Sequence, residues 1–494
     1  MKKVIIVGAG ISGLAAGVYA AQSGFDVTIY ESHNIPGGAS TSWRRGGYLF
    51  EGGMHWLTGS SPKTQLNKFW REVGALNDDV PIYNRDPFFT FEYKGQTACL
   101  YRDVEQLRQH FLSISPEDKQ EIESLCRDIK KFSKVQMPLT DIKGVKVKKA
   151  SKMPVSLIFG MLPAIPRMGF YSNMSVAEYS MRFQSPLLRM LLQHSIGPDY
   201  AANGLLFTIA TLASGDGGYP AGGSLAMAQR MAETFQSLGG SFRYRTSVEK
   251  VSVSNGVADG VIIGGELKYA DAIIVTKDTL SAIDTFFDEP IHEPWAEQMR
   301  QNTKPMLNTY ICLGVETDLS DLPENVSFLP KIPIQCGNIH AEAIGFNNYA
   351  RYEGYAPKGC TALTAAIMGD SYDFWKECRE NGTYADEKAK LAQTYIQALC
   401  EQYPQIKDKV VVWDVATPLT YERYLGSYKG SWMTLMERGQ SNVAYPCKPD
   451  SIQNVYFAGQ RLTSPGGLPV ALSTGRTAVQ HLCRDTHTVF QSGL

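Results

Sequence analysis

The first 31 residues constrain the fold most strongly. Val4 to Val7 form a short β-branched run, which is typical of a strand buried on both faces. Gly8-Ala9-Gly10-Ile11-Ser12-Gly13 follows directly and opens a helical pattern that ends at Gly24. The run from Phe25 to Tyr30 predicts a second strand, which closes on Glu31. Strand, glycine turn, helix, strand and acid in this order predict a Rossmann-like α/β domain with a dinucleotide site.

Each glycine of the turn answers a separate steric requirement. Gly8 lets the chain leave the strand sharply, Gly10 lets backbone amides approach a pyrophosphate, and Gly13 lets the helix pack on the sheet. The helix N-terminus then offers unpaired N–H groups and a positive dipole end to phosphates. Glu31 stands 18 residues after Gly13, close to the spacing at which a carboxylate reaches a ribose hydroxyl. An acid there favours a free 2′-hydroxyl, as in FAD or NAD.

A second glycine pair follows the acid, in the stretch Asn34-Ile35-Pro36-Gly37-Gly38-Ala39-Ser40-Thr41-Ser42. With this stretch the chain resembles the flavoprotein superfamily of amine oxidases, phytoene desaturases, retinol saturases and Rab GDP-dissociation inhibitors (GDI). In that superfamily the second pair also approaches the FAD diphosphate. The resemblance implies non-covalent FAD in a domain of the glutathione-reductase/GDI type, bound here by Gly37, Gly38, Ala39 and Ser40 as well as by the first turn, Ile11 and Ser12 included.

The segment from Gly46 to Gly59 resembles the carotenoid desaturase, carotenoid isomerase and retinol saturase branch. Members usually carry Phe-Asp and then Gly, whereas this chain has Glu51 for the Asp and keeps Gly53. The resemblance places Gly53, Met54 and His55 beside the flavin. His55 is therefore the leading candidate for a catalytic polar group, and the alternative is a histidine hydrogen-bonded in the core of the FAD domain.

Near the C-terminus, Asn454 to Gln460 predicts a strand running into a turn, and Val470 to Cys483 predicts a helix. The resemblance places Gly459 and Gln460 at the phosphates, and the helix start, Gly467-Leu468-Pro469-Val470, at the flavin pyrimidine. A helix N-terminus there would stabilise the negative charge of reduced flavin. Relatives often have an acid after the glycine, so Gln460-Arg461 is a departure. The resemblance also places Val248, in a predicted strand over 242–253, at the adenine.

The rest of the chain is expected to build a second domain. A chain of 494 residues with 44% apolar content can bury a core large enough for two or more domains. We expect an FAD-binding domain over 1–75, 215–285 and 446–494 and a discontinuous α+β substrate domain, mixed-sheet and helical, over 76–214 and 286–445. Helices are predicted over 62–77, 175–192, 225–236 and 386–402, and strands over 269–276, 309–315 and 360–366.

The stretches Thr417 to Tyr424 and Gly426 to Gly430 resemble a loop that the retinol saturase branch keeps near the flavin. Tyr424 and Lys429 are therefore weaker catalytic candidates, with a plain surface loop as the alternative.

The segment from 143 to 174 combines lysines with an apolar run. Lys143, Lys146, Lys148, Lys149 and Lys152 precede a run that prolines interrupt. The run is too short to span a bilayer, which takes about 20 residues. Two interpretations remain: a monotopic contact with anionic lipid, or a surface loop leading into a buried helix.

Composition excludes several classes of function. A net charge of −1, without a basic aromatic-rich region, argues against nucleic acid as a partner. The nine cysteines are scattered, odd in number and without a CxxC pair, which predicts reduced thiols and no metal site. The N-terminus does not resemble a signal peptide, because its apolar run belongs to the nucleotide fold. We expect a cytoplasmic protein, with peripheral contact at the inner face of the membrane as the further expectation.

The leading functional hypothesis is an FAD-dependent oxidoreductase that desaturates or saturates carbon–carbon bonds of a hydrophobic polyene, such as a carotenoid or retinoid, by hydride exchange with flavin N5. A reduced-FAD-dependent cis–trans isomerase of a polyene is a close alternative. A flavin amine oxidase and a non-enzymatic prenyl-lipid carrier of GDI type are the others.

Overall fold

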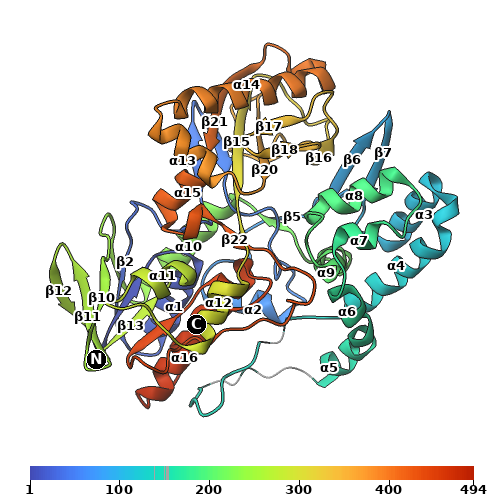
Figure 1. The fold of residues 1–494 in the computed structure, drawn as a ribbon. Coiled ribbons are helices and arrows are strands. Elements are labelled where there is room, and N and C mark those ends of the chain that lie inside the picture. Colours follow the sequence, from blue (N-terminus) through green and yellow to red (C-terminus); the bar gives the residue numbers. More distant parts are fainter. Residues whose placement is uncertain (138, 149–150, 152–154, 494) are drawn as a thin grey trace.

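The computed structural model describes residues 1–137, 139–148, 151 and 155–493. A five-stranded parallel sheet forms the nucleotide-binding part, in the order β23-β13-β1-β2-β9. Its strands are β1 (Lys3–Val7), β2 (Asp26–Tyr30), β9 (Ser241–Arg243), β13 (Ala272–Val275) and β23 (Val455–Phe457). The first and last parts of the chain thus meet in one sheet (Figure 1). The predicted α/β class is confirmed.

The two faces of this sheet bury alternate side chains of each strand. Val4 and Ile6 face a core that includes α1 (Ile11–Gln22), with α10 (Gly223–Ser237) and α16 (Gly467–Asp485) each packed against α1. Ile5 and Val7 face a second core. That core is covered by an antiparallel sheet and two helices: β10 (Lys250–Ser254), β11 (Val257–Ile263), β12 (Glu266–Tyr269), α11 (Thr279–Thr285) and α12 (Pro294–Asn302).

A seven-stranded mixed sheet forms the centre of the remaining chain, in the order β21-β15-β20-β19-β16-β6-β7. Its strands are β6 (Phe89–Tyr93), β7 (Gln96–Leu100), β15 (Asn308–Val315), β16 (Asn325–Phe328), β19 (Ile344–Asn348), β20 (Thr361–Met368) and β21 (Val410–Ala416). Helices α13 (Tyr372–Glu380) and α14 (Tyr384–Gln402) contribute to the core at one end. All its pairings are antiparallel except β16–β6.

A helical lobe packs on the β6–β7 end of this sheet (Figure 1). It comprises α3 (Val104–Ile114), α4 (Lys119–Phe132), α5 (Val155–Met161), α6 (Ile165–Ser172), α7 (Val176–Ser180), α8 (Pro186–Ile196) and α9 (Ala202–Ala213). Short elements join the parts: α2 (Gln65–Glu72), β3 (Ser42–Arg45), β4 (Tyr48–Glu51), β5 (Ile82–Tyr83), β8 (Tyr219–Pro220), β14 (Pro305–Met306), β17 (Ile334–Cys336), β18 (Ile339–Ala341), α15 (Pro418–Leu425) and β22 (Met433–Thr434).

Several predicted elements are wrong. The single helix over 175–192 is two helices, because Ser185 caps α8 and Pro186 occupies its first position. The strand over 242–253 is interrupted between β9 and β10, and the strand over 269–276 is reduced to β13. The helix over 62–77 shortens to α2, and the predicted loop at 417–424 is helix α15.

The predicted division into two domains stays a prediction. Within the described residues, no helix is both long and apolar enough to cross a bilayer. All nine cysteines are described, and each is free.

Candidate active site

One continuous cavity of about 1990 Å³ runs from the glycine turn after β1 to the helical lobe. Pockets for small ligands typically measure about 300–1,000 Å³, so this cavity has room for a dinucleotide and a second ligand. It is lined at one end by the turns that follow β1, β2 and β13. At the other end it is lined by α8, α9, β14 and β22.

The glycine turn has the backbone that a dinucleotide site requires. Gly8 adopts a φ of 103°, which side-chain-bearing residues rarely adopt. A Cβ atom on Gly13 would lie 1.9 Å from the carbonyl oxygen of Gly8, so only glycine lets α1 approach the strand. The second glycine pair lies against this turn, since the Gly37 N–H donates to the Ala9 carbonyl at 2.8 Å. Gly10 and Gly37 form a parallel bridge.

Glu31 ties the turn to the end of β2. Its Oε2 accepts from the Ala9 N–H and its Oε1 from the His33 N–H, both at 2.7 Å. A carboxylate has about four acceptor positions, so Glu31, which lines the cavity, can still accept a ribose hydroxyl.

The residues present fit FAD. Two buried hydroxyls on the cavity wall, Ser40 Oγ and Thr279 Oγ1, have no hydrogen-bond partner within the described residues. Ser40 follows the second glycine pair, and Thr279 Oγ1 would lie 3.5 Å from a Cβ atom on Gly459. Unpaired hydroxyls beside glycine turns and the start of α1 offer donors suited to a diphosphate.

The structure brings nearly all the predicted cofactor residues to this cavity. The lining includes Gly8, Gly10, Ile11, Ser12, Glu31, Gly37, Gly38, Ala39, Ser40, Gly53, Met54, His55, Val248, Gly459, Gln460, Gly467, Leu468, Pro469 and Val470. Gly13 lies beneath the turn and does not line the cavity. The individual contacts of these residues with FAD stay predictions.

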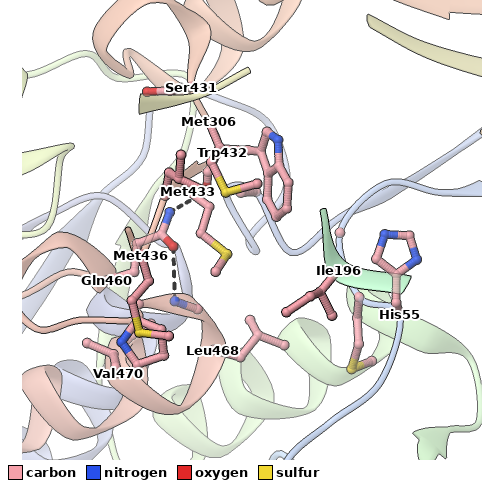
Figure 2. A pocket seen from close by; sticks show the side chains of 18 of the residues that line it. His55, Ile196, Met306, Ser431, Trp432, Met433, Met436, Gln460, Leu468 and Val470 are labelled. Carbon is pink, nitrogen blue, oxygen red and sulfur yellow. Dashed lines mark hydrogen bonds between the residues drawn. The ribbon is translucent and has the colours of Figure 1, made fainter. Parts of the chain in front are cut away.

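Gln460 explains the departure from an acid at this position. Its Nε2 donates to the Trp432 carbonyl and its Oε1 accepts from the Gly467 N–H at 3.1 Å (Figure 2). This neutral amide joins the β22 segment to the first residue of α16. The positive end of α16 therefore faces the cavity without a carboxylate from this position, which favours negative charge on a bound flavin.

His55 lies across the cavity from the methionines of β22 and its flank, with Ile196 and Leu468 pointing into the space between (Figure 2). Burial, and then the nearby Arg85 guanidinium, lower the pKa of His55 to about 4. A hydrogen bond with the Asn347 side chain raises this pKa but does not offset the other two effects. The imidazole is therefore neutral at pH 7.

The sequence did not predict the polar residues around His55, which include Arg85 and Asn347. Arg85 is buried, donates from Nε to Tyr352 Oη at 2.7 Å and reaches Asn347 Oδ1 at 3.4 Å. It also lies 5.2 Å from the centre of the Tyr219 ring. No local signal marks Arg85, because its partners are more than a hundred residues away in the sequence.

Glu51 fixes the wall beside His55. Its fully buried carboxylate accepts from the N–H groups of Gly53 at 2.9 Å, Met54 at 3.1 Å and Ser224 at 2.9 Å. It also accepts from Tyr219 Oη at 2.6 Å. The glutamate that departs from the desaturase pattern thus anchors the segment after β4 and the start of α10.

The other two catalytic candidates lie elsewhere. Tyr424 lines the cavity at its nucleotide end, where its ring meets that of His33 at 5.2 Å. Lys429 lines a separate cavity of about 370 Å³, with Arg300 and Asp370. Neither contact involves His55, and the catalytic roles of all three residues stay predictions.

The far end of the cavity is an apolar chamber rich in methionine. Its side chains include Phe88, Met161, Met168, Ile196, Phe207, Met306, Met433 and Met436. Methionine is unbranched and polarisable, so such a wall adapts to long or irregular hydrocarbons.

A glycine-turn dinucleotide site that opens into an apolar chamber defines the class of flavin-dependent oxidoreductases with a Rossmann-type domain. Comparison with known families agrees. The family described as flavin containing amine oxidoreductase matches residues 11–483, and the chain belongs to this family. The protein is therefore an FAD-dependent enzyme, as the sequence predicted.

Several curated relatives match nearly the whole chain. A 1-hydroxycarotenoid 3,4-desaturase of Flavobacterium sp. strain P99-3 is 25% identical, over 96% of this chain and 98% of its own length. A prolycopene isomerase of Daucus carota is 22% identical, over 95% of this chain and 78% of its own. Among solved structures, a putrescine oxidase variant superimposes with a TM-score of 0.63 at 16% identity, covering 98% of this chain and 99% of that one. The last likeness shows the fold alone.

Proposed function

We propose that the protein desaturates or saturates carbon–carbon bonds of a hydrophobic polyene, such as a carotenoid or retinoid. The observation that carries this proposal is the methionine-rich chamber, which continues directly into the nucleotide site. The carotenoid desaturases among the full-length relatives support the same substrate class. Bound FAD would supply hydride exchange at flavin N5.

The chain itself contributes orientation and a dry environment. The methionines of β14, β22 and Met436 hold an extended hydrocarbon against the wall that Leu468 and Ile196 complete (Figure 2). The resting His55 imidazole is neutral and places no charge in the chamber, so it can donate or accept a hydrogen bond at this wall. If it accepts a proton during the reaction it becomes a cation, which its low pKa disfavours, so it would hold that proton only briefly.

The test is anaerobic and uses the full-length holoenzyme. If the oxidised enzyme loses its flavin colour with a precursor that has fewer double bonds than the polyene, the protein is a desaturase. If the reduced enzyme regains its flavin colour with a polyene, the protein is a saturase. Either result, with the matching product by chromatography, supports the proposal.

A product that differs only in double-bond geometry, formed while the flavin stays reduced, would identify an isomerase, which the Daucus carota relative makes the second candidate. Reduction of the flavin by amines alone would overturn the polyene proposal.

We further propose that α5 and α6 meet a membrane surface, which would let the substrate enter from the bilayer. Val155, Phe159 and Ile165 are each more than half exposed, at 66%, 67% and 55%. The same helices supply Met161 and Met168 to the chamber, and α5 lies at the lower edge of the molecule (Figure 1). Short exposed apolar helices that follow lysines in the sequence suit a monotopic contact with anionic lipid.

Of the predicted basic cluster, Lys143, Lys146 and Lys148 are exposed, whereas Lys149 and Lys152 lie outside the described residues. This proposal includes a peripheral position at the cytoplasmic face of a membrane. Flotation with anionic vesicles should capture the wild type and lose Phe159→Asp. The control Tyr269→Asp, on an exposed β12 residue, should float as the wild type does. Equal flotation of both variants would contradict the proposal.

A further inference from the structure

The segment α15 and the single turn after it, Tyr428–Gly430, cross from the substrate region to the nucleotide end of the cavity. Helix α15 packs on α13 and β21 of the upper part, between the two large sheets (Figure 1). Its Tyr424 ring contacts the ring of His33 edge-on, and His33 lies two residues after Glu31 in the sequence. The Tyr428 N–H donates to Asp278 Oδ2 at 2.8 Å. We name the stretch from 418 to 430 the strap.

Arg423 is held against Tyr424 at this place. Its Nη2 donates to Tyr424 Oη at 2.6 Å, and its guanidinium lies 4.5 Å from the centre of the same ring. Arg423 and Tyr424 both line the cavity. Within the described residues, Arg423 forms no ion pair with a carboxylate.

A second cation, Lys277, follows the residue that packs on the glycine turn. Thr276 packs against that turn, with Oγ1 2.8 Å from the position of a Cβ atom on Gly8 and 3.0 Å from one on Gly13. Lys277 follows and lines the cavity, with Nζ 5.0 Å from the centre of the Phe286 ring. Its Cε touches the strap, 3.4 Å from the position of a Cβ atom on Gly426.

Lys277 forms no ion pair in the described part of the chain. Burial lowers the pKa of Lys277, which the neighbouring Asp278 opposes. Yet the Asp278 carboxylate is hydrogen-bonded to Arg461, Leu280 and Tyr428, and not to Lys277. A partly desolvated ammonium without a paired carboxylate gains strongly from an anion placed next to it.

We infer that Lys277 and the strap form a clamp on the ADP half of FAD, in which Lys277 meets the diphosphate and the Arg423–Tyr424 pair covers the adenosine. The glycine turns supply only N–H donors and a helix dipole, whereas a diphosphate carries at least two negative charges. Lys277 supplies positive charge at that point. Arg423 presents a planar cation and Tyr424 a ring, both of which stack on a base. The clamp does not depend on which substrate occupies the chamber.

The test separates the two halves of the cofactor by titrating full-length apoprotein with ADP, riboflavin and FAD. Lys277→Met keeps an unbranched side chain beside Phe286 and removes the charge. We expect it to weaken ADP and FAD by about tenfold or more and to leave riboflavin unchanged, since one charge-assisted bond is worth roughly 1.5–3 kcal/mol. Lys277→Arg should keep most of the affinity for ADP.

The matched control is Lys388→Met, because the Lys388 Nζ also lies over an aromatic ring, 5.4 Å from the centre of the Tyr384 ring, and Lys388 lines neither cavity. This variant should bind all three ligands as the wild type does. Arg423→Gln should weaken ADP by a few-fold, and the ADP affinity of Lys277→Met should depend less on salt than that of the wild type. Unchanged ADP affinity in Lys277→Met would overturn the clamp. An equal loss of affinity for ADP and for riboflavin in Lys277→Met would also overturn the clamp, because it would show that the substitution disturbs the folded protein as a whole. Neither result would affect the polyene proposal, which product formation tests.

Discussion

The buried ion pair between Asp278 and Arg461 should dominate the stability of the junction between the nucleotide-binding part and the strap. Their side chains are 6% and 3% exposed. Arg461 donates from Nε to Oδ1 at 2.6 Å and from Nη2 to Oδ2 at 3.0 Å. The carboxylate also caps α11 through the Leu280 N–H at 3.1 Å and holds the Tyr428 N–H at 2.8 Å.

Asp278→Leu would leave the Arg461 charge buried without a partner. Removing one member of a buried pair costs about 3–5 kcal/mol, and the lost helix cap adds about 1 kcal/mol. The double variant Asp278→Leu, Arg461→Met removes the stranded charge as well. We expect it to recover most of the loss and to remain about 1–2 kcal/mol below the wild type, because a buried pair replaced by apolar groups is often neutral.

The assay is urea unfolding of the four proteins of this double-mutant cycle, with Arg461→Met as the fourth. With a slope of about 3 kcal/mol per M, a loss of about 4–6 kcal/mol lowers the unfolding midpoint by roughly 1.3–2 M. The slope must stay the same in all four proteins for the comparison to hold. A shift below about 0.3 M in Asp278→Leu, or a double variant less stable than both single variants, would refute the reasoning.

Three further predictions follow from the site. Gly13→Ala places a methyl group 1.9 Å from the Gly8 carbonyl oxygen. This should lower the free energy of unfolding by about 3 kcal/mol or more and leave the purified protein without bound flavin. In the control Gly169→Ala the new methyl group meets no atom within 4 Å, so this variant should keep its flavin. The pKa of His55 is about 4 in the folded protein and 6.5 for an unburied histidine, so the unfolded chain binds this proton first as the pH drops. The free energy of unfolding therefore falls between pH 6.5 and about pH 4. His55→Gln should reduce this fall in a series of urea midpoints measured against pH, and an unchanged series would contradict the assignment. Gln460→Glu puts a negative charge at the start of α16 and should lower the flavin potential by on the order of 20–40 mV in a dye-equilibration titration; an unchanged or raised potential would show that this helix end does not act on the flavin.

The nucleotide-binding part could be predicted because its requirements are met by neighbouring residues. The sharp turn at Gly8 and the close packing at Gly13 are properties of one short stretch, and Glu31 lies at a fixed distance along the chain. The helix predicted over 470–483 is present as α16, but α16 begins three residues earlier, at Gly467.

Other parts depend on contacts between distant residues. Tyr424 was assigned to the flavin end from a short resemblance, whereas its contact with His33 joins residues 391 positions apart. The link from Arg85 to Asn347 spans 262 positions, and no periodicity announces it. Pro186 marks the start of α8, but the apolar residues continue at helical spacing from 176 to 192, so the sequence predicted one helix.

The order of strands in the parallel sheet has a consequence for biosynthesis. Strand β23 pairs with β13, and α16 packs against α1, so the sheet and the flavin end of the site need residues near both ends of the chain. A ribosome must therefore complete residues 455–485 before this compartment can close. Cofactor loading should then follow synthesis of β23 and α16, and until that moment the apolar chamber has no closed wall on its flavin side.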